Sequence, residues 1–171
     1  SWDRNLEGQL PEQWSTLTKL QKLCLDENQL SGPLPVDWSA LVSLQRLDLG
    51  HNNLSGQLPR QWSALTNLQY LVISSNKLSG QFPHEWSTLT NLRELRLHYN
   101  QLSGQLPEQL SGLSSLRLAS NKLVAQVPQQ WPELVPNLQD LDLRDPRYQL
   151  SGEILTGKCE VVPGFCACHL W

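Results

Sequence analysis

Leucines recur along the chain with two spacings at once. In short segments such as 22–26 and 46–50 they alternate with other residues, and the same arrangement returns every 24 residues. Alternation is typical of a β-strand with one apolar face, because successive side chains point to opposite sides. One such strand cannot bury its face alone. The period therefore predicts a stack of coils whose strands form a parallel sheet over a shared core.

Each coil carries a fixed set of polar and turn residues after its strand. The order is L-x-x-L-x-L-x-x-N-x-L-S-G, with the asparagine at Asn28, Asn52, Asn76 and Asn100. An asparagine amide both donates and accepts hydrogen bonds, so we expect a buried ladder of these side chains. The glycine permits a tight bend of the backbone.

This motif resembles the signature of leucine-rich repeat proteins, and the resemblance covers nearly the whole chain. It implies an α/β repeat fold, mostly β with short helical or 3-10 turns, arranged as a solenoid with a concave parallel sheet. The L-S-G-x-L-P segment resembles the plant-specific repeat class, which adds a short second strand on the flank of each coil.

The array is less regular toward its C-terminus. Asn121 follows Asn100 by 21 residues, so this coil has lost three, and the next repeat contains extra residues. We expect repeats over 1–152, made of a partial first coil, four regular coils and two irregular ones, and a cysteine-containing cap over 153–171. No capping segment precedes the first coil, so either a partner covers that end of the core or upstream sequence is missing.

A tryptophan lies on the return segment of each regular coil, three residues after a proline. The equivalent residues are Trp14, Trp38, Trp62 and Trp86. Equivalent positions stack, so we expect an aromatic ladder inside the solenoid. Counting by 24 puts Leu110 at this position in the fifth coil, and Trp131 restores the ring in the next. Interchange with leucine favours core packing, and stacking of exposed indoles on sugar rings is the alternative.

The tryptophan segments also narrow the resemblance. Residues 10–23 (LPEQWSTLTKLQKL) and 82–95 (FPHEWSTLTNLREL) are similar to the L-P-x-x-W-S repeats of the promastigote surface antigen family of kinetoplastid parasites. Plant receptors and plant polygalacturonase inhibitors usually carry Ile-Pro and an aliphatic residue in these places. The resemblance implies a surface protein that contacts a host receptor.

Composition excludes several classes of function. The net charge of −3 is too small to indicate a nucleic acid or an anionic membrane as partner. No apolar run reaches the roughly 18 residues of a membrane span.

Neither a phosphate-binding loop, nor a nucleophile elbow, nor a His-x-x-x-His spacing occurs in the sequence. A shallow ribbon also offers no pocket in which catalytic groups converge. We therefore expect no enzyme activity, no catalytic residue, no cofactor and no metal site.

Binding is expected on the concave face, at the residues that alternate with the strand leucines. Tyrosine and arginine carry much of the energy at protein interfaces. The predicted partner-binding residues are Arg46, His51, Tyr70, Glu94, Arg96, His98, Tyr99 and Arg117. An ordinary solvated face is the alternative. Six strands present roughly 380 Å², less than the about 800 Å² of a standard interface. Either the flanks contribute or the chain is part of a longer binder.

The four cysteines divide into Cys24 on the first full strand and three in the tail. Some five coils separate the groups, whereas a disulfide needs Cα atoms within about 7 Å. We expect one tail disulfide, Cys159 with Cys166 or Cys168, and a Cys24 thiol that stays open to reagents. One tail thiol is then left over, which could pair outside the chain. Zinc binding by the tail Cys-x-Cys-His segment is the alternative.

Asn53 opens the only N-glycosylation sequon and is expected to point outward. Taken together, the residues predict a non-enzymatic protein-recognition module that binds a protein partner, either a receptor or a neighbouring subunit. The predicted place is a cell surface or another oxidising compartment. Two rival hypotheses are a structural scaffold subunit of a larger protist or algal membrane assembly, and an extracellular enzyme inhibitor like those of plant walls.

Overall fold

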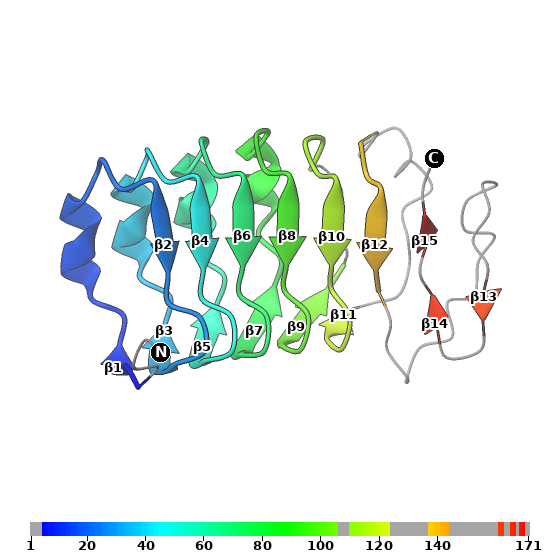
Figure 1. Cartoon of the computed structure of the whole chain (residues 1–171), viewed down its shortest axis with the longest axis horizontal. Helices are drawn as coiled ribbons and strands as arrows, with labels where there is room; N and C mark the ends of the chain where they lie inside the picture. Colours follow the sequence, from blue (N-terminus) through cyan, green and yellow to red (C-terminus); the bar gives the residue numbers. More distant parts are fainter. Residues whose placement is uncertain are drawn as a thin grey trace.

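The computed structural model describes residues 5–105, 110–123 and 137–143, and the strand residues 161–162, 165–166 and 168–169. Within them the chain winds into coils that lie side by side in one row (Figure 1). Each regular coil contributes one strand to a front sheet, a second strand to a flank sheet, and a 3-10 turn on its return segment. The predicted leucine-rich repeat solenoid with parallel sheets is confirmed.

The front sheet has seven strands in the order β15-β12-β10-β8-β6-β4-β2. Their bounds are β2 (Lys22–Cys24), β4 (Arg46–Asp48), β6 (Tyr70–Val72), β8 (Glu94–Arg96), β10 (Ser115–Arg117), β12 (Asp140–Asp142) and β15 (Cys168–His169). From β2 to β12 the pairing is parallel and in register, so the central leucines of neighbouring strands lie opposite one another. In contrast, β15 pairs antiparallel with β12.

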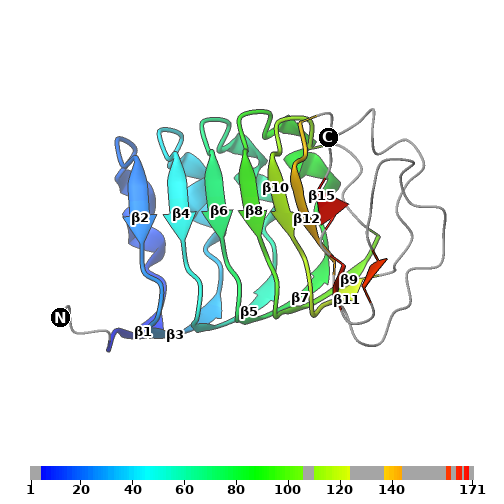
Figure 2. The same ribbon diagram turned by 45° about the vertical axis from the view of Figure 1, so that its right-hand side comes forward.

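The flank sheet confirms the second strand that the L-S-G-x-L-P segment predicts. Its order is β1-β3-β5-β7-β9-β11 (Figure 2). The bounds are β1 (Glu7–Gln9), β3 (Gln29–Pro33), β5 (Asn53–Gln57), β7 (Lys77–Gln81), β9 (Gln101–Gly104) and β11 (Lys122–Leu123). A separate antiparallel pair is formed by β13 (Val161–Val162) and β14 (Phe165–Cys166). The expected boundary between 152 and 153 lies outside the described residues and stays a prediction.

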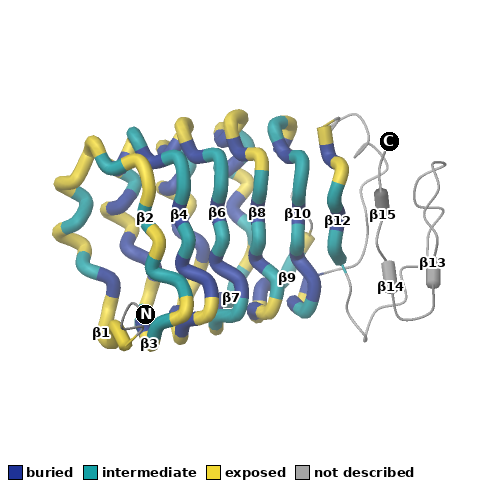
Figure 3. Tube along the Cα trace, in the orientation of Figure 1, coloured by how far each residue is buried: buried dark blue, intermediate teal, exposed yellow. Residues whose placement is uncertain are grey.

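The return segments contain four 3-10 turns, each opened by a proline. They are η1 (Glu12–Thr16), η2 (Val36–Ala40), η3 (Arg60–Ala64) and η4 (His84–Thr88). Proline suits the position before the turn, because its fixed φ matches the extended backbone there and no N–H is lost from the turn. The tryptophans of these turns belong to, or pack against, the same buried apolar cluster as the core leucines. Figure 3 shows buried stretches that recur along the interior coils.

The tryptophan ladder is structural, as the sequence predicts. The Trp38, Trp62 and Trp86 side chains are fully buried. Successive rings from Trp14 onward are nearly parallel, with centroids 6.0, 6.4 and 6.4 Å apart. Each buried indole Nε1 donates to the proline carbonyl of the preceding coil at 2.9 Å. These three indoles therefore have no exposed face on which a sugar could stack.

The asparagine ladder is also confirmed. The Asn52 Nδ2 donates to the Leu25 carbonyl of the preceding coil at 2.9 Å, and its Oδ1 accepts from the Leu30 N–H at 3.0 Å. The same two kinds of bond recur at Asn76 and Asn100. These amides satisfy backbone groups in the bend that would otherwise be buried without partners.

The fifth coil corrects one prediction. The Leu113 N–H donates to the Leu110 carbonyl, as the Leu92 N–H donates to the Leu89 carbonyl one coil earlier. Leu110 therefore occupies the position of Leu89 and not that of Trp86. The prediction was wrong because counting by 24 ignored where the three residues are lost, namely before Leu110. Trp131 lies outside the described residues.

Candidate partner-binding site

The predicted binding residues lie on the front sheet and on the bends that follow its strands. Arg46, Tyr70 and Glu94 stand opposite one another on β4, β6 and β8. Two positions further along the strands, Arg96 on β8 stands opposite Arg117 on β10. The remaining three, His51, His98 and Tyr99, lie on the bends beyond the strands.

These side chains form two clusters and not one patch. In the strand cluster, the Arg46 guanidinium lies over the Tyr70 ring, 5.7 Å from its centroid. In the bend cluster, the rings of His98 and Tyr99 meet edge to face at 5.5 Å. Tyr99 lies five residues beyond Glu94, the register partner of Tyr70, which is on the order of 15 Å along an extended chain. Tyr70 and Tyr99 therefore lie at separate places along the face.

The strand arginines already have anionic partners. Arg46 pairs with Asp48 at 3.3 Å, Arg96 pairs with Glu94, and Arg117 pairs with Asp140 at 2.9 Å. Their side chains nevertheless stay about two fifths exposed. Because each guanidinium is matched by a carboxylate, the face has mixed charge and is not basic. Pairs this exposed contribute at most about 1 kcal/mol each and leave the arginines able to meet a partner.

Burial sets the charge of His98. Its Nδ1 atom is buried with no hydrogen-bond partner among the described residues. Burial lowers the pKa of His98, and the nearby Arg117 and Arg96 lower it further, which outweighs the opposite effect of Asp142. The imidazole is therefore neutral at pH 7.

The bend cluster includes a residue with a left-handed backbone. Tyr99 has φ of 56°, and the equivalent His51 has φ of 53°. This left-handed conformation is uncommon for residues with a Cβ. The same conformation recurs once per coil, at Glu27, Ser75 and Ser120 as well, and at Tyr99 the side chain is 61% exposed. Sequence reasoning did not predict this conformation, because neither glycine nor asparagine marks the position.

A floor of small residues also escaped the sequence-based prediction. Ser74 is buried, and Gly50 packs so that a Cβ there would lie 3.4 Å from the Ser74 Oγ and the Asp48 Oδ1. The buried Ala119 occupies the same position in the fifth coil, and His98 occupies it in the coil between. Small residues at Gly50, Ser74 and Ala119 were the available signal. His98 therefore has a small residue at the equivalent position in each neighbouring coil.

Other predicted features are placed as follows. Cys24 is a free, exposed thiol, and Asn53 is exposed on the flank sheet. Cys159 lies outside the described residues, and of Cys166 and Cys168 only the backbone strands are described. Where the structure is described, no group of three or more His, Cys, Asp or Glu side chains could hold a metal ion. No helix in that part of the chain is long and apolar enough to cross a membrane.

Comparison with known proteins agrees with this architecture. Leucine-rich repeat family profiles match residues 19–41, 43–65 and 56–102. Among curated proteins no significant match is found. The crystal structure of a TDR receptor is similar with a TM-score of 0.77 and 34% identity, over 80% of this chain and 24% of that one. The Arabidopsis receptor kinase HAESA, solved with a peptide hormone and a co-receptor, is similar with a TM-score of 0.77 and 32% identity. The match covers 82% of this chain and 24% of the HAESA chain.

A shorter relative matches over most of its own length. The leucine-rich repeat ectodomain of the receptor kinase SOBIR1 from Arabidopsis thaliana is 31% identical with a TM-score of 0.66, over 71% of this chain and 67% of that one. By contrast, the chain spans only about a quarter of the TDR and HAESA structures. The coil geometry, the profiles and these similarities agree, and the chain belongs to the leucine-rich repeat family.

Proposed function

We propose that this chain is a non-enzymatic module that recognises a protein partner through its front face. The observation that carries the proposal is the bend cluster, in which Tyr99 is 61% exposed on a left-handed backbone and contacts His98. An exposed aromatic ring held by a fixed backbone provides contact area at little entropic cost. The strand cluster of Arg46 and Tyr70 offers a second contact point on the same face.

The charge of the face indicates the kind of partner. Arg46, Arg96 and Arg117 are each paired within the sheet. A strongly acidic partner would have to compete with these carboxylates, whereas a mixed polar and aromatic surface would fit between them. The relatives solved with peptide hormones support a protein or peptide partner. Because those relatives are several times longer, this face would supply part of a larger binding surface.

The finer predictions stay part of the proposal. Similarity to receptor ectodomains supports an extracellular or cell-surface place, where Asn53 could carry a sugar and two of Cys159, Cys166 and Cys168 could form a disulfide. The L-P-x-x-W-S repeats support the promastigote surface antigen subfamily.

Alanine substitution of Tyr70, Arg96 and Tyr99 together tests the proposal. The triple variant should lose at least about 2 kcal/mol of binding free energy, roughly a factor of 30, if these residues carry the contact. Wild-type chain is immobilised, extracellular material is passed over it, and retained proteins are identified. The affinity of each is then measured by calorimetry for the wild-type and variant chains.

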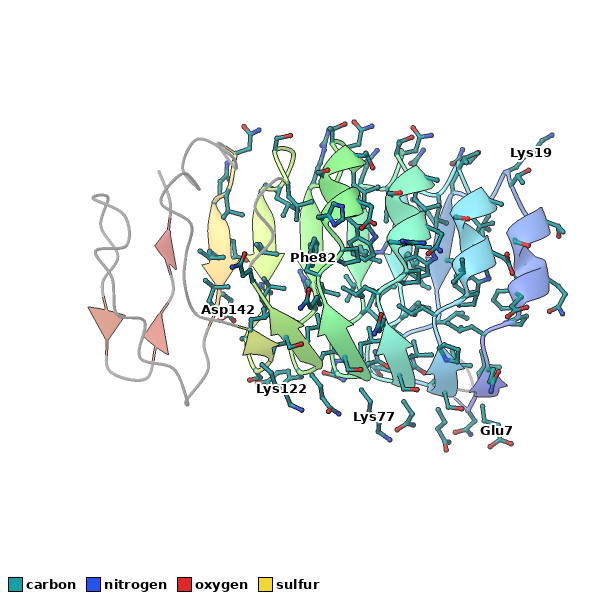
Figure 4. The ribbon with its side chains drawn as sticks, turned by 180° about the vertical axis from the view of Figure 1, so that it is seen from behind. Glu7, Lys19, Lys77, Phe82, Lys122 and Asp142 are labelled. Atoms are coloured by element: carbon teal, nitrogen blue, oxygen red, sulfur yellow. The ribbon has the colours of Figure 1, made fainter. Side chains whose placement is uncertain are left out.

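A matched control uses three exposed residues of the flank sheet, Lys77, Gln81 and Gln101, changed to alanine together. Lys77 projects from the lower edge of the molecule, beside the flank strands (Figure 4). Partners kept by the wild type and the control, and lost by the triple variant, support the front face. Equal affinity for all three folded chains would exclude it. Separate Tyr70→Ala and Tyr99→Ala variants assign the loss to one cluster.

A further inference from the structure

The imidazole of His98 is the partly enclosed member of the bend cluster. Its Nδ1 atom is buried and has no hydrogen-bond partner among the described residues. The residues at the equivalent position of the two neighbouring coils, Ser74 and Ala119, are small and buried. From this place between the two coils the ring meets Tyr99 edge to face, with the ring centroids 5.5 Å apart.

This place suits a neutral imidazole and not a protonated one. A protonated imidazole carries a hydrogen on both ring nitrogens. The hydrogen on the buried Nδ1 of His98 would then meet no acceptor among the described residues. Leaving a charged donor buried and unsatisfied costs more than leaving a neutral group so. Protonation therefore favours a ring position in which Nδ1 reaches water.

The charged groups around His98 act in the same direction. Burial is the largest cause that lowers the pKa of His98. Arg117 on β10 and Arg96 on β8 also lower it, and His51 on the bend two coils earlier adds a smaller effect. Asp142 on β12 raises it but does not outweigh the others. A positive ring is therefore repelled from three sides and attracted from one.

The backbone of the bend cluster is held by the neighbouring coils. The His98 carbonyl accepts from the Ser75 N–H at 2.9 Å, and the Tyr99 carbonyl accepts from the Asn76 N–H at 3.1 Å. On the other side, the Tyr99 N–H donates to the Ala119 carbonyl at 3.0 Å. None of these bonds involves a group that titrates. A proton on His98 thus acts on the side chains of the cluster and leaves the coils in place.

We propose that the bend cluster is an acid-operated switch: when His98 takes up a proton, its ring leaves the enclosed place, the contact with Tyr99 is lost, and a partner held by Tyr99 binds less tightly. Only the last step rests on the proposed function, because the ring movement belongs to the chain alone. The partner selects the neutral ring, so binding weakens as the pH falls and recovers at neutral pH. Such a module releases its partner in an acidic compartment.

Fluorine NMR of the whole chain, labelled with 3-fluorotyrosine, tests the ring movement. The chain has three tyrosines, and Tyr99→Phe identifies the Tyr99 signal. Between pH of about 7.5 and about 4.5, this signal should shift with the same midpoint as the His98 ring protons. The shift should be absent in His98→Phe, which keeps a ring but takes up no proton. It should persist in His84→Gln, which removes an exposed histidine of η4.

Circular dichroism over the same pH range checks that the coils stay folded. A Tyr99 signal that does not follow the His98 midpoint, or that shifts equally in His98→Phe, would overturn the switch.

Calorimetry tests the release, with the proteins that the wild-type chain retains near neutral pH as probes. At each pH the dissociation constant of the wild type is divided by that of His98→Phe, so that titration of the partner itself cancels. This ratio should rise up to tenfold per pH unit below the His98 midpoint. A ratio that stays constant would overturn the release. The two proposals fail separately, because the triple alanine variant tests the site at neutral pH and the fluorine titration needs no partner.

Discussion

At the scale of single residues, His98 is the histidine whose environment lowers its pKa. It lies between the paired arginines and the exposed Tyr99, with a buried Nδ1 that has no hydrogen-bond partner among the described residues. Its pKa is lowered by burial first and by Arg117 and Arg96 next. The folded state therefore holds this proton less tightly than the unfolded chain does.

This difference predicts that the free energy of unfolding falls as the pH drops below about 6.5, the usual pKa of histidine. Below that pH the unfolded chain takes up the proton before the folded chain does, and the loss continues until the lower folded pKa is reached. Urea melts between pH 7.5 and 5, as chosen test conditions, should show a smaller loss in His98→Gln than in the wild type. An NMR titration placing His98 at or above about 6.5 would contradict this.

At the scale of elements, the flank strands depend on a contact between neighbouring coils. Gly80 has φ of +81°, and a Cβ there would lie 2.9 Å from the Gln57 Cγ of the preceding coil. Gly56 has nearly the same φ of +83°, but its nearest neighbour is the Pro33 Cβ at 3.6 Å. The two glycines thus share a backbone requirement and differ in the space around them.

Gly80→Ala should therefore be more destabilising than Gly56→Ala. Both lose about 1–2 kcal/mol to the left-handed backbone, and Gly80→Ala should lose about 1 kcal/mol more through the collision with Gln57. Urea denaturation measures both. In a chain that also carries Gln57→Ala, the extra loss of stability from Gly80→Ala should disappear. Equal losses in the two single variants would mean that the glutamine moves aside without cost.

The shortened fifth coil gives a second prediction at this scale. Leu110 is 2% exposed and takes the place of Leu89, so it has no room for an indole. We expect Leu110→Trp to destabilise the chain by about 1–3 kcal/mol through overpacking, and Leu110→Met to cost less than about 1.5 kcal/mol. A thermal melt in which Leu110→Trp is stabilising would show instead that this position continues the tryptophan ladder.

At the scale of the whole molecule, each coil contacts only its neighbouring coils. The contribution of a ladder residue to stability therefore depends on its place in the row. Trp62 lies between two other rings and is fully buried, whereas Trp14 has a ring on one side and is partly buried. Trp62 also donates from Nε1 to the Pro35 carbonyl at 2.9 Å.

Trp62→Ala should therefore cost about 3–5 kcal/mol, the range for a buried aromatic truncation. Trp14→Ala should cost clearly less, because part of its ring already contacts water. Urea melts compare the two variants. A loss below about 1 kcal/mol for Trp62→Ala would mean that the ring is not part of the core.

The sequence by itself determined the repeat architecture. The 24-residue period, the strand alternation and the recurring asparagines and tryptophans indicate the coils, both ladders and the front positions of Arg46, Tyr70 and Arg96. These features depend on which residue follows which within one coil. Stacking repeats the same contacts from coil to coil, so local spacing is sufficient to predict them.

Only the tertiary structure decided how the front side chains combine. Arg117 pairs with Asp140, 23 residues away, because β10 and β12 are neighbours in register. The loss of three residues in the fifth coil moves Leu110 out of the tryptophan position, and Tyr99 lies five residues along the coil from Glu94, the register partner of Tyr70. Charge pairing, register and backbone handedness depend on what lies beside a residue in the next coil, and no spacing within a single coil contains that information.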